Sequence, residues 1–470
     1  MNQLIAFLRP SSLFNLLCSF ILIILVSSSF TWAQDSFDNT TVSTSWTPEE
    51  LHTVGTAASA QQLEYYIRQL ADFGTRHTLS DTVSNTRGIG AARRWIKAEF
   101  EKISEECGGC LEVFYVSGIV GPQNRIPVAT NVVNVVAIQR GYADPNRFVV
   151  MSGDIDSRVS DPTNGISDSP GANDNASGMA GAIEAARILS TYQFPSSIIY
   201  TGLSGEEQGL LGGKILADYA IANEWDIKGV LNNDMIGNIE GTNGVIDNKS
   251  FRIFSEPVPG NESEGSRSSR RFFGGEIDGN SRQLARFIYN ATKTYIPDLK
   301  PNLIYRLDRF GRGGHHRPFN DLGYAGVRIM ESNENYNRQH QDIRVENGIK
   351  YGDVVEGVDF EYAKKLTQVN AICLALLGWS PPPPTGLRIG GIVEPSTKFI
   401  WNKDENDDIV GYKIYWRETT SPVWQYEKKI DKKNFYVLKD VIIDNYLFGI
   451  SSINNNGFES IQKFPSGIFR

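Results

Sequence analysis

The sequence predicts an α/β fold followed by an all-β domain. Short apolar runs typical of buried strands alternate with longer segments of helical periodicity through the middle of the chain. Strands that alternate with helices form a mostly parallel sheet covered on both faces. Several strand-like runs come early with no helix between them, which adds an antiparallel contribution. We therefore expect a three-layer α/β/α arrangement around a mixed, mostly parallel sheet, and then a β-sandwich.

Length and composition bound the function. At 470 residues the chain exceeds one ordinary core, so two folded domains are expected. Its 40% hydrophobic and 21% charged residues are typical of a globular protein. The net charge of -8, without a basic cluster, argues against nucleic acid as a partner.

The N-terminus has the pattern of a secretory signal peptide. Arg9 precedes an apolar run at 13–26, and small residues up to Ala33 offer a cleavage position. A membrane anchor is the alternative, but it needs about twenty apolar residues and this run is shorter. We expect residues 1–33 to be removed, leaving no integral membrane segment in a protein that is secreted, periplasmic or at the cell surface. Residues 34–58 are predicted to form a flexible arm.

One domain is predicted over residues 59–380. Helical periodicity predicts helices at 59–73, 89–103, 178–190, 209–223, 281–295 and 361–377. Apolar runs predict strands at 111–116, 131–139, 148–152, 198–203, 229–232 and 325–329. The segment 257–269 is rich in Gly, Ser and Glu and is expected to be a mobile loop. One suggestion is that this loop lies at the rim of a site.

The last segment, 381–470, begins with four prolines that form a stiff spacer, so the domain boundary is placed there. Short alternating strands follow at 397–401, 409–417, 435–438 and 446–453. The strand containing Trp401 and the run Gly411-Tyr-Lys-Ile-Tyr-Trp416 resemble a fibronectin type III module. The alternative is a carbohydrate-binding domain, which only the aromatic residues of this segment favour. The partner of this module is not predicted.

The cysteines beyond the N-terminal segment suggest structural roles. Cys107-Gly-Gly-Cys110 can close a small disulfide loop, which an exported protein permits. A metal or redox pair is the alternative, but a second CxxC and nearby histidines are missing. Cys373 lies in an apolar helical run and is expected to fill the core.

Acidic and histidine residues recur where the predicted strands end. The motifs are Asp154-Ile155-Asp156, Asp174 within Pro170-Gly-Ala-Asn-Asp-Asn-Ala-Ser-Gly178, Glu206-Glu207 within Ser204-Gly-Glu-Glu-Gln-Gly209, Asp234 after Asn232-Asn233, and His315-His316 after Gly313-Gly314. Loops at the carboxyl ends of strands converge on one crevice in open α/β sheets. Carboxylates and imidazoles there can bind metal ions. Two adjacent glutamates point opposite ways, so one can bind a metal while the other faces a water.

Together, and in this order, these motifs resemble the zinc-dependent aminopeptidases of peptidase family M28 over roughly residues 60–378. The resemblance implies two zinc ions on a mixed α/β/α sheet, and hydrolysis at the N-termini of peptides or proteins. It implies that Asp174 bridges the ions, that Asp154 and Asp234 complete the first site, and that Glu207 and His316 complete the second. Glu206 would be the general base, and Asp156 would orient the first ligand.

The chain departs from the family at two positions. The family has His-x-Asp where this chain has Asp154-Ile155-Asp156, and commonly an Asp where this chain has His315. An all-carboxylate first site also suits manganese, calcium or magnesium. One hypothesis is that His315 reaches the first metal, so that its replacement by alanine removes one ion. Tyr336 and His340 are expected at the rim, where they either hold the substrate or form a structural loop.

Two alternatives to an aminopeptidase stay open. Glutaminyl cyclases resemble these peptidases in fold, use a single zinc and cyclise N-terminal glutamine without hydrolysis. A degenerate peptidase retained for adhesion is the non-enzymatic alternative. Glu206 distinguishes the enzyme from the adhesion protein, because a protein that only binds has no need of a base beside the metal.

Overall fold

The computed structural model describes residues 49–470, which belong to one compact unit, Thr40–Arg470. The expected signal peptide at 1–33 and most of the expected arm at 34–58 lie outside the described residues. Within residues 49–470, none of the helices combines the length and the apolar character needed to cross a membrane.

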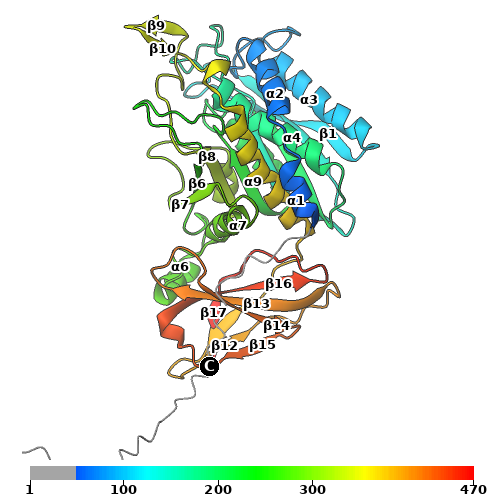
Figure 1. The fold of residues 1–470 in the computed structure, drawn as a ribbon, viewed down its shortest axis with the longest axis vertical. Helices are drawn as coiled ribbons and strands as arrows, with labels where there is room; N and C mark the ends of the chain where they lie inside the picture. The colour runs from blue at the N-terminus through cyan, green and yellow to red at the C-terminus, as the bar shows by residue number, and fades with distance from the viewer. Residues whose placement is uncertain (1–48) are drawn as a thin grey trace, which may run out of the picture. The chain divides into compact units, whose positions relative to one another are not determined.

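In this part of the chain an eight-stranded mixed sheet forms the centre of the fold, in the order β1-β2-β4-β3-β5-β8-β6-β7 (Figure 1). Strands β4, β3, β5 and β8 run parallel to one another, whereas β1 and β2 are antiparallel additions at one edge. Strand β6 is antiparallel to β8 and parallel to β7. The strands are β1 (Leu111–Val120), β2 (Thr130–Gln139), β3 (Asp144–Asp154), β4 (Ser196–Leu203), β5 (Asp226–Asn233), β6 (Ser250–Ser255), β7 (Lys300–Ile304) and β8 (Gly326–Glu331). The predicted mixed sheet is confirmed.

Helices cover both faces of the sheet. One face packs against α1 (Glu49–Thr56), α2 (Ala60–Asp72), α3 (Gly88–Glu106), α4 (Gly178–Leu189), α7 (Asn280–Tyr295) and α9 (Phe360–Trp379). The other packs against α5 (Leu211–Ala222) and α8 (His316–Asp321). Strand β3 serves both layers, because Val149 and Met151 join the first core while Phe148 and Val150 join the second. The predicted three-layer arrangement is therefore confirmed.

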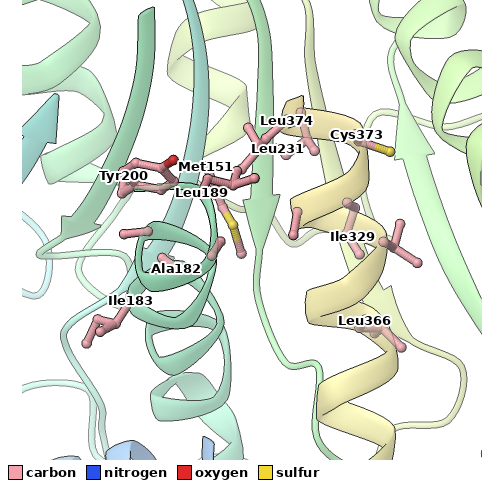
Figure 2. Packing of buried hydrophobic residues seen from close by; sticks show 14 of the residues in the cluster. Met151, Ala182, Ile183, Leu189, Tyr200, Leu231, Ile329, Leu366, Cys373 and Leu374 are labelled. Carbon is pink, nitrogen blue, oxygen red and sulfur yellow. The ribbon is translucent and has the colours of Figure 1, made fainter. Parts of the chain in front are cut away.

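The larger core joins the sheet to α4 and α9 (Figure 2). Met151, Leu231 and Ile329 come from three neighbouring strands and are fully buried. Leu374 and Cys373 of α9 are buried in the same cluster, so the predicted core position of Cys373 is confirmed. Helix α9 is apolar on most of its surface, as a helix covering the centre of a sheet should be.

The C-terminal residues form two small sheets around a core of their own. One sheet has the order β15-β12-β11-β17 and the other β14-β13-β16. Their strands are β11 (Arg388–Gly390), β12 (Thr397–Ile400), β13 (Ile409–Glu418), β14 (Tyr426–Asp431), β15 (Phe435–Leu438), β16 (Tyr446–Asn454) and β17 (Gly467–Ile468). Trp401 and Tyr412 meet edge to face between them and are almost fully buried. The all-β ending is as predicted, while its fibronectin type III identity and the boundary at 381 stay predictions.

Several elements differ from the predictions. Residues 49–56 of the expected arm form α1, because Leu51 and Val54 share one face and are fully buried.

The expected loop at 257–269 contains the start of α6 (Glu264–Phe273). Ser263 caps this helix, and none of its residues is buried, so it has no apolar stripe for the sequence to reveal. Strands β6 and β7 and the hairpin of β9 (Arg344–Glu346) and β10 (Ile349–Tyr351) were not predicted. The short turns η2 (Val355–Gly357) and η3 (Ile443–Asn445) complete the elements.

The disulfide between Cys107 and Cys110 is formed, as predicted. It closes the turn between α3 and β1, where Cys107 follows the last residue of the helix. The turn needs the two intervening glycines, because Gly108 and Gly109 have φ of 76° and 90°.

A buried ion cluster joins α7 to β13. Asp278 lies two residues before α7 and pairs with Arg286 at 2.8 Å and with Arg417 at 2.7 Å, and all three side chains are fully buried. Replacing Asp278 by alanine leaves two buried guanidinium groups without their carboxylate. We expect the free energy of unfolding to fall by about 3–5 kcal/mol, measured by urea denaturation.

The matched control is Glu112→Ala. Glu112 pairs with Arg140 at the surface, where its side chain is 54% exposed. Its loss should lower the free energy of unfolding by less than about 1 kcal/mol. Equal losses in the two variants would contradict the role given to Asp278.

Candidate functional site

The acidic motifs meet at the carboxyl ends of three neighbouring parallel strands. Asp154 is the last residue of β3, Glu206 and Glu207 follow β4, and Asp234 follows β5. Strand β3 lies between the other two, and the register places Asp154 opposite Leu203 and Gly153 opposite Asn233. The predicted convergence of these loops therefore follows from the sheet order.

Asp174 reaches the same place from the turn η1 (Ala172–Ser177), which leads into α4. The start of α4 packs tightly over the end of β3, since a Cβ on Gly153 would lie 2.4 Å from the backbone nitrogen of Met179. This approach lets the Asn175 side chain donate a hydrogen bond to Asp154 at 2.7 Å. Glycine at 153 is thus required for the two loops to meet.

Asp174, Glu207 and His340 form one cluster of potential metal ligands, with ligand atoms within 4.8 Å of one another. His340 Nε2 lies 3.0 Å from Asp174 Oδ2 and 2.8 Å from Glu207 Oε1. Burial alone would lower the pKa of His340, but Glu207 and Asp174 raise it to about 9. Two acidic oxygens and an imidazole in this arrangement fit a divalent cation, which would take the place of the proton.

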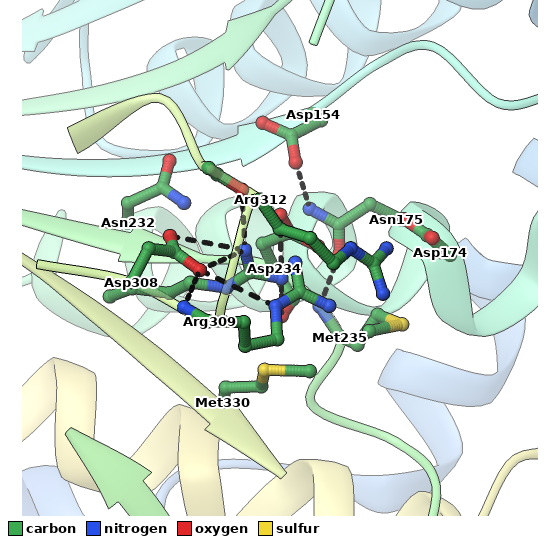
Figure 3. Close-up of polar contacts among 12 residues, drawn as sticks. Asp154, Asp174, Asn175, Asn232, Asp234, Met235, Asp308, Arg309, Arg312 and Met330 are labelled. Atoms are coloured by element: carbon green, nitrogen blue, oxygen red, sulfur yellow. Dashed lines mark hydrogen bonds and ion pairs between the residues drawn. The ribbon is translucent and has the colours of Figure 1, made fainter. Parts of the chain in front are cut away.

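Asp154 and Asp234 are a second pair of buried carboxylates. Burial raises the pKa of Asp154 well above its ordinary value, and Asp156 adds to the effect. Burial, Asp154 and Asp174 also raise the pKa of Asp234 to about 8, although Arg328 pairs with it at 2.8 Å. Figure 3 shows Asp154 with its hydrogen bond to Asn175, and Asp234 among the arginine side chains. Like charges in a buried site are costly without a cation. The cluster of potential ligand atoms found among residues 49–470 does not include Asp154 or Asp234.

Glu206 differs from its neighbours because its carboxylate has no hydrogen-bond or ion-pair partner among residues 49–470. It lines an open cavity of about 430 Å³ together with Asp174, Glu207, Asp234 and His340. Burial, Asp234 and Glu207 raise the pKa of Glu206 well above its ordinary value. Asp156 accepts hydrogen bonds from the backbone N–H groups of Glu206 and Glu207, at 3.1 and 3.0 Å. In the structure, Asp156 therefore holds the two glutamates in place.

The two adjacent histidines face different surroundings. His315 Nδ1 lies 2.6 Å from Asp154 Oδ1, and its Nε2 is buried without a partner in the described chain. His316 Nε2 lies 2.9 Å from the carbonyl oxygen of Leu307 and 3.7 Å from Asp308. The structure thus places His340, rather than His316, beside Asp174 and Glu207.

Tyr336 lies away from the cluster. Its side chain is not among those lining the cavity, the residue is 59% exposed, and its backbone N–H donates to Thr242.

Sequence reasoning missed two arginines that contact the site. Arg328 of β8 is fully buried and contacts both Asp234 and Asp308. Arg158 donates to Glu207 Oε2 at 2.7 Å, and one of its terminal nitrogens lies 2.6 Å from His340 Nδ1. The sequence did contain a signal for Arg328, because this arginine interrupts the apolar run of a predicted strand. A buried arginine needs carboxylate partners, so its position could have predicted a contact with the acidic residues.

The comparisons with known proteins identify the family of this chain. Residues 134–346 match the family model of peptidase family M28. A relative from Pyrenophora tritici-repentis, named a probable zinc metalloprotease, is 40% identical over 89% of this chain and 87% of its own length. This chain belongs to peptidase family M28. A second relative of the same name, from Phaeosphaeria nodorum, is 37% identical over 90% of this chain and 89% of its own length.

Among solved structures, the Legionella pneumophila LapA aminopeptidase superposes on this M28 chain with a TM-score of 0.51. The match covers 71% of this chain and 76% of that protein, at 15% sequence identity. At that identity the likeness shows a shared fold.

The pH dependence of stability should report the burial of His316. Burial lowers the pKa of His316 to about 4 in the folded protein. In the unfolded chain, the pKa of a histidine is about 6.5. Since the unfolded state takes up the proton first, this contribution to stability is present above pH 6.5 and is lost as the pH falls towards 4.

The test compares the wild-type protein with His316→Gln in chelator, by urea denaturation at several pH values. The difference in unfolding free energy between them should fall by about 1.4 kcal/mol for each pH unit below 6.5. A difference that does not change with pH would contradict the burial of a neutral His316.

Proposed function

We propose that this protein is a secreted metal-dependent aminopeptidase that removes the N-terminal residue of peptides. The observation that carries the proposal is the convergence of buried carboxylates and His340 on one open cavity, in which Glu206 alone of the carboxylates has no partner among residues 49–470. Secretion is supported by the signal-like pattern of residues 1–33 and by the disulfide between Cys107 and Cys110.

Two zinc ions suit the ligands, and the names of the zinc metalloprotease relatives support zinc. We assign one ion to Asp174, Glu207 and His340, and the other to Asp154, Asp234 and a shared Asp174. Because the first site, with Asp154, Asp174 and Asp234, is all carboxylate, it also suits manganese or magnesium. When bound, such ions polarise the scissile carbonyl and acidify the attacking water.

Glu206 is proposed as the general base. Its carboxylate lines the cavity and has no partner in the described chain, so it can take a proton from the attacking water and pass it to the leaving amine. The carboxylate charges that raise its pKa are the ones that bound cations would neutralise. Asp156 holds Glu206 and Glu207 through their backbone N–H groups. One carboxylate can then bind metal while its neighbour stays free.

The structure favours a different role for each histidine from the one that the resemblance implied. We propose His340 as the metal ligand of the second site, because its Nε2 lies within 3.0 Å of both Asp174 and Glu207. His316 instead holds the segment before it through the Leu307 carbonyl. His315 orients Asp154, which stands where the family has a histidine. The two positions at which this chain departs from the family, Asp154 and His315, are thus in direct contact.

Replacing Glu206 by glutamine tests the base. We expect hydrolysis of aminoacyl chromogenic substrates to fall by about 10²- to 10⁴-fold, while metal content and far-UV circular dichroism stay unchanged. Glu224→Gln, an exposed glutamate after α5, is the matched control and should keep full activity. Formation of pyroglutamate from N-terminal glutamine without any hydrolysis would favour the cyclase alternative. Retained adhesion without any hydrolysis in the wild-type protein would favour the binding alternative.

Metal content separates the two histidine assignments. Elemental analysis of the wild-type protein is expected to give two ions per chain. His340→Ala should lower the content by about one ion, because it removes a ligand from a three-residue site. His316→Ala should keep both ions. The reverse pattern would return the second site to His316.

A further inference from the structure

Five arginine side chains share the cavity with the acidic residues. They are Arg125, Arg158, Arg309, Arg312 and Arg317. Of the residues lining this cavity, Leu210 alone carries an apolar side chain. Such a wall offers little to a large apolar substrate side chain and much to an anion.

Three of these arginines are engaged by carboxylates. Arg158 pairs with Glu207, and its side chain is 13% exposed. Arg309 and Arg312 both contact Glu334 Oε2, at 2.8 and 3.2 Å. Figure 3 shows these last two arginines beside Asp234.

Arg125 and Arg317 are engaged by backbone oxygens instead. Arg125 is exposed and donates from one terminal nitrogen to the carbonyl oxygen of Glu207, at 2.8 Å. Arg317 donates to the carbonyl oxygen of Arg312 at 3.4 Å, and its Nε is buried without a partner in the described chain. Neither forms an ion pair with a carboxylate between residues 49 and 470. Each guanidinium therefore keeps donors for a ligand in the cavity.

The charge balance points the same way. Asp174, Glu206, Glu207 and Asp234 are the acidic residues that line the cavity, against five guanidinium groups. The metal ions of the proposed function would neutralise the carboxylates and leave the arginines in excess. A guanidinium presents a planar fork of N–H donors that matches a carboxylate.

We propose that this cavity selects peptides that carry a carboxylate, and that Arg125 and Arg317 bind it. The inference rests on the proposed function and adds a substrate class to it. The carboxylate comes either from an acidic N-terminal side chain or from the free C-terminus of a short peptide. Both sources present the same planar anion to the arginines.

Three dipeptides of nearly equal size separate these sources. Asp-Leu amide carries only the side-chain carboxylate, Asn-Leu with a free C-terminus carries only the terminal one, and Asn-Leu amide carries neither. For the wild-type protein, kcat/KM for at least one of the first two should exceed that for Asn-Leu amide by about tenfold or more. Preference for Asp-Leu amide assigns the arginines to the N-terminal side chain, and preference for free Asn-Leu assigns them to the C-terminus.

The variants Arg125→Gln and Arg317→Gln test the two residues. Each should lower the kcat/KM ratio of the preferred peptide to Asn-Leu amide by about tenfold to hundredfold, because a charged hydrogen bond is lost. The control is Arg306→Gln, since Arg306 is exposed on the same loop as Arg309, stacks on Phe310 and does not line the cavity. Its ratio should equal that of the wild-type protein.

A ratio near one in the wild-type protein, or an unchanged ratio in both arginine variants, would overturn the inference while leaving the aminopeptidase intact. Absence of hydrolysis for all three peptides would count against the proposed function instead. Calorimetric titration of Asp-Leu amide, free Asn-Leu and Asn-Leu amide into the metal-loaded Glu206→Gln protein then decides the inference by binding alone. Tighter binding of a carboxylate-bearing peptide, weakened by Arg125→Gln or Arg317→Gln, supports it, and equal binding of all three overturns it.

Discussion

The constraint on which this structure depends is the gathering of like charges out of water. Asp154 at the end of β3 meets Asp174, Glu207 and Asp234 from three loops, and burial disfavours the ionised forms of Asp154 and Asp234. The surrounding chain compensates with cations of its own, such as Arg328 against Asp234 and Arg158 against Glu207. The cluster of Asp174, Glu207 and His340 that remains could hold a divalent ion. The rigid sheet and the tight contact at Gly153 keep the loops from relaxing apart.

Much of this arrangement could be predicted because strand order and strand ends follow from local patterns. The alternation of apolar runs and helical segments predicted the three layers, and the position of Asp154, Glu206, Glu207 and Asp234 just beyond their strands predicted that they meet. Strand β6 was missed although Phe251 and Ile253 alternate with Arg252, a pattern that a strand on a sheet should show. Helix α6 could not be seen in the same way, because it buries no residue and owes its ends to capping.

The position of His340 beside Asp174 and Glu207 lay beyond the sequence for a physical reason. His316 follows a glycine pair and begins a helix, so its position resembles the other motifs. His340 sits in an irregular loop between β8 and β9, with a φ of 55° that no periodicity announces. Which loop folds back over a sheet edge depends on long-range contacts, here those of Gln339 with Asp174 and of Arg158 with His340. Such contacts leave no local pattern.

The ion cluster at Asp278 has a consequence for how the chain can be divided. A boundary drawn at the proline spacer separates Arg417 from Asp278, although these side chains share two hydrogen bonds with no exposure to water. Asn454 also donates to the carbonyl oxygen of Trp379, and Trp379 stacks on Phe458. A chain ending at 380 would therefore lose these contacts and expose Trp379 and the buried pair of Asp278 and Arg286 to water. The spacer marks a change of architecture, and the C-terminal sheets belong to the same compact unit as the peptidase fold that precedes them.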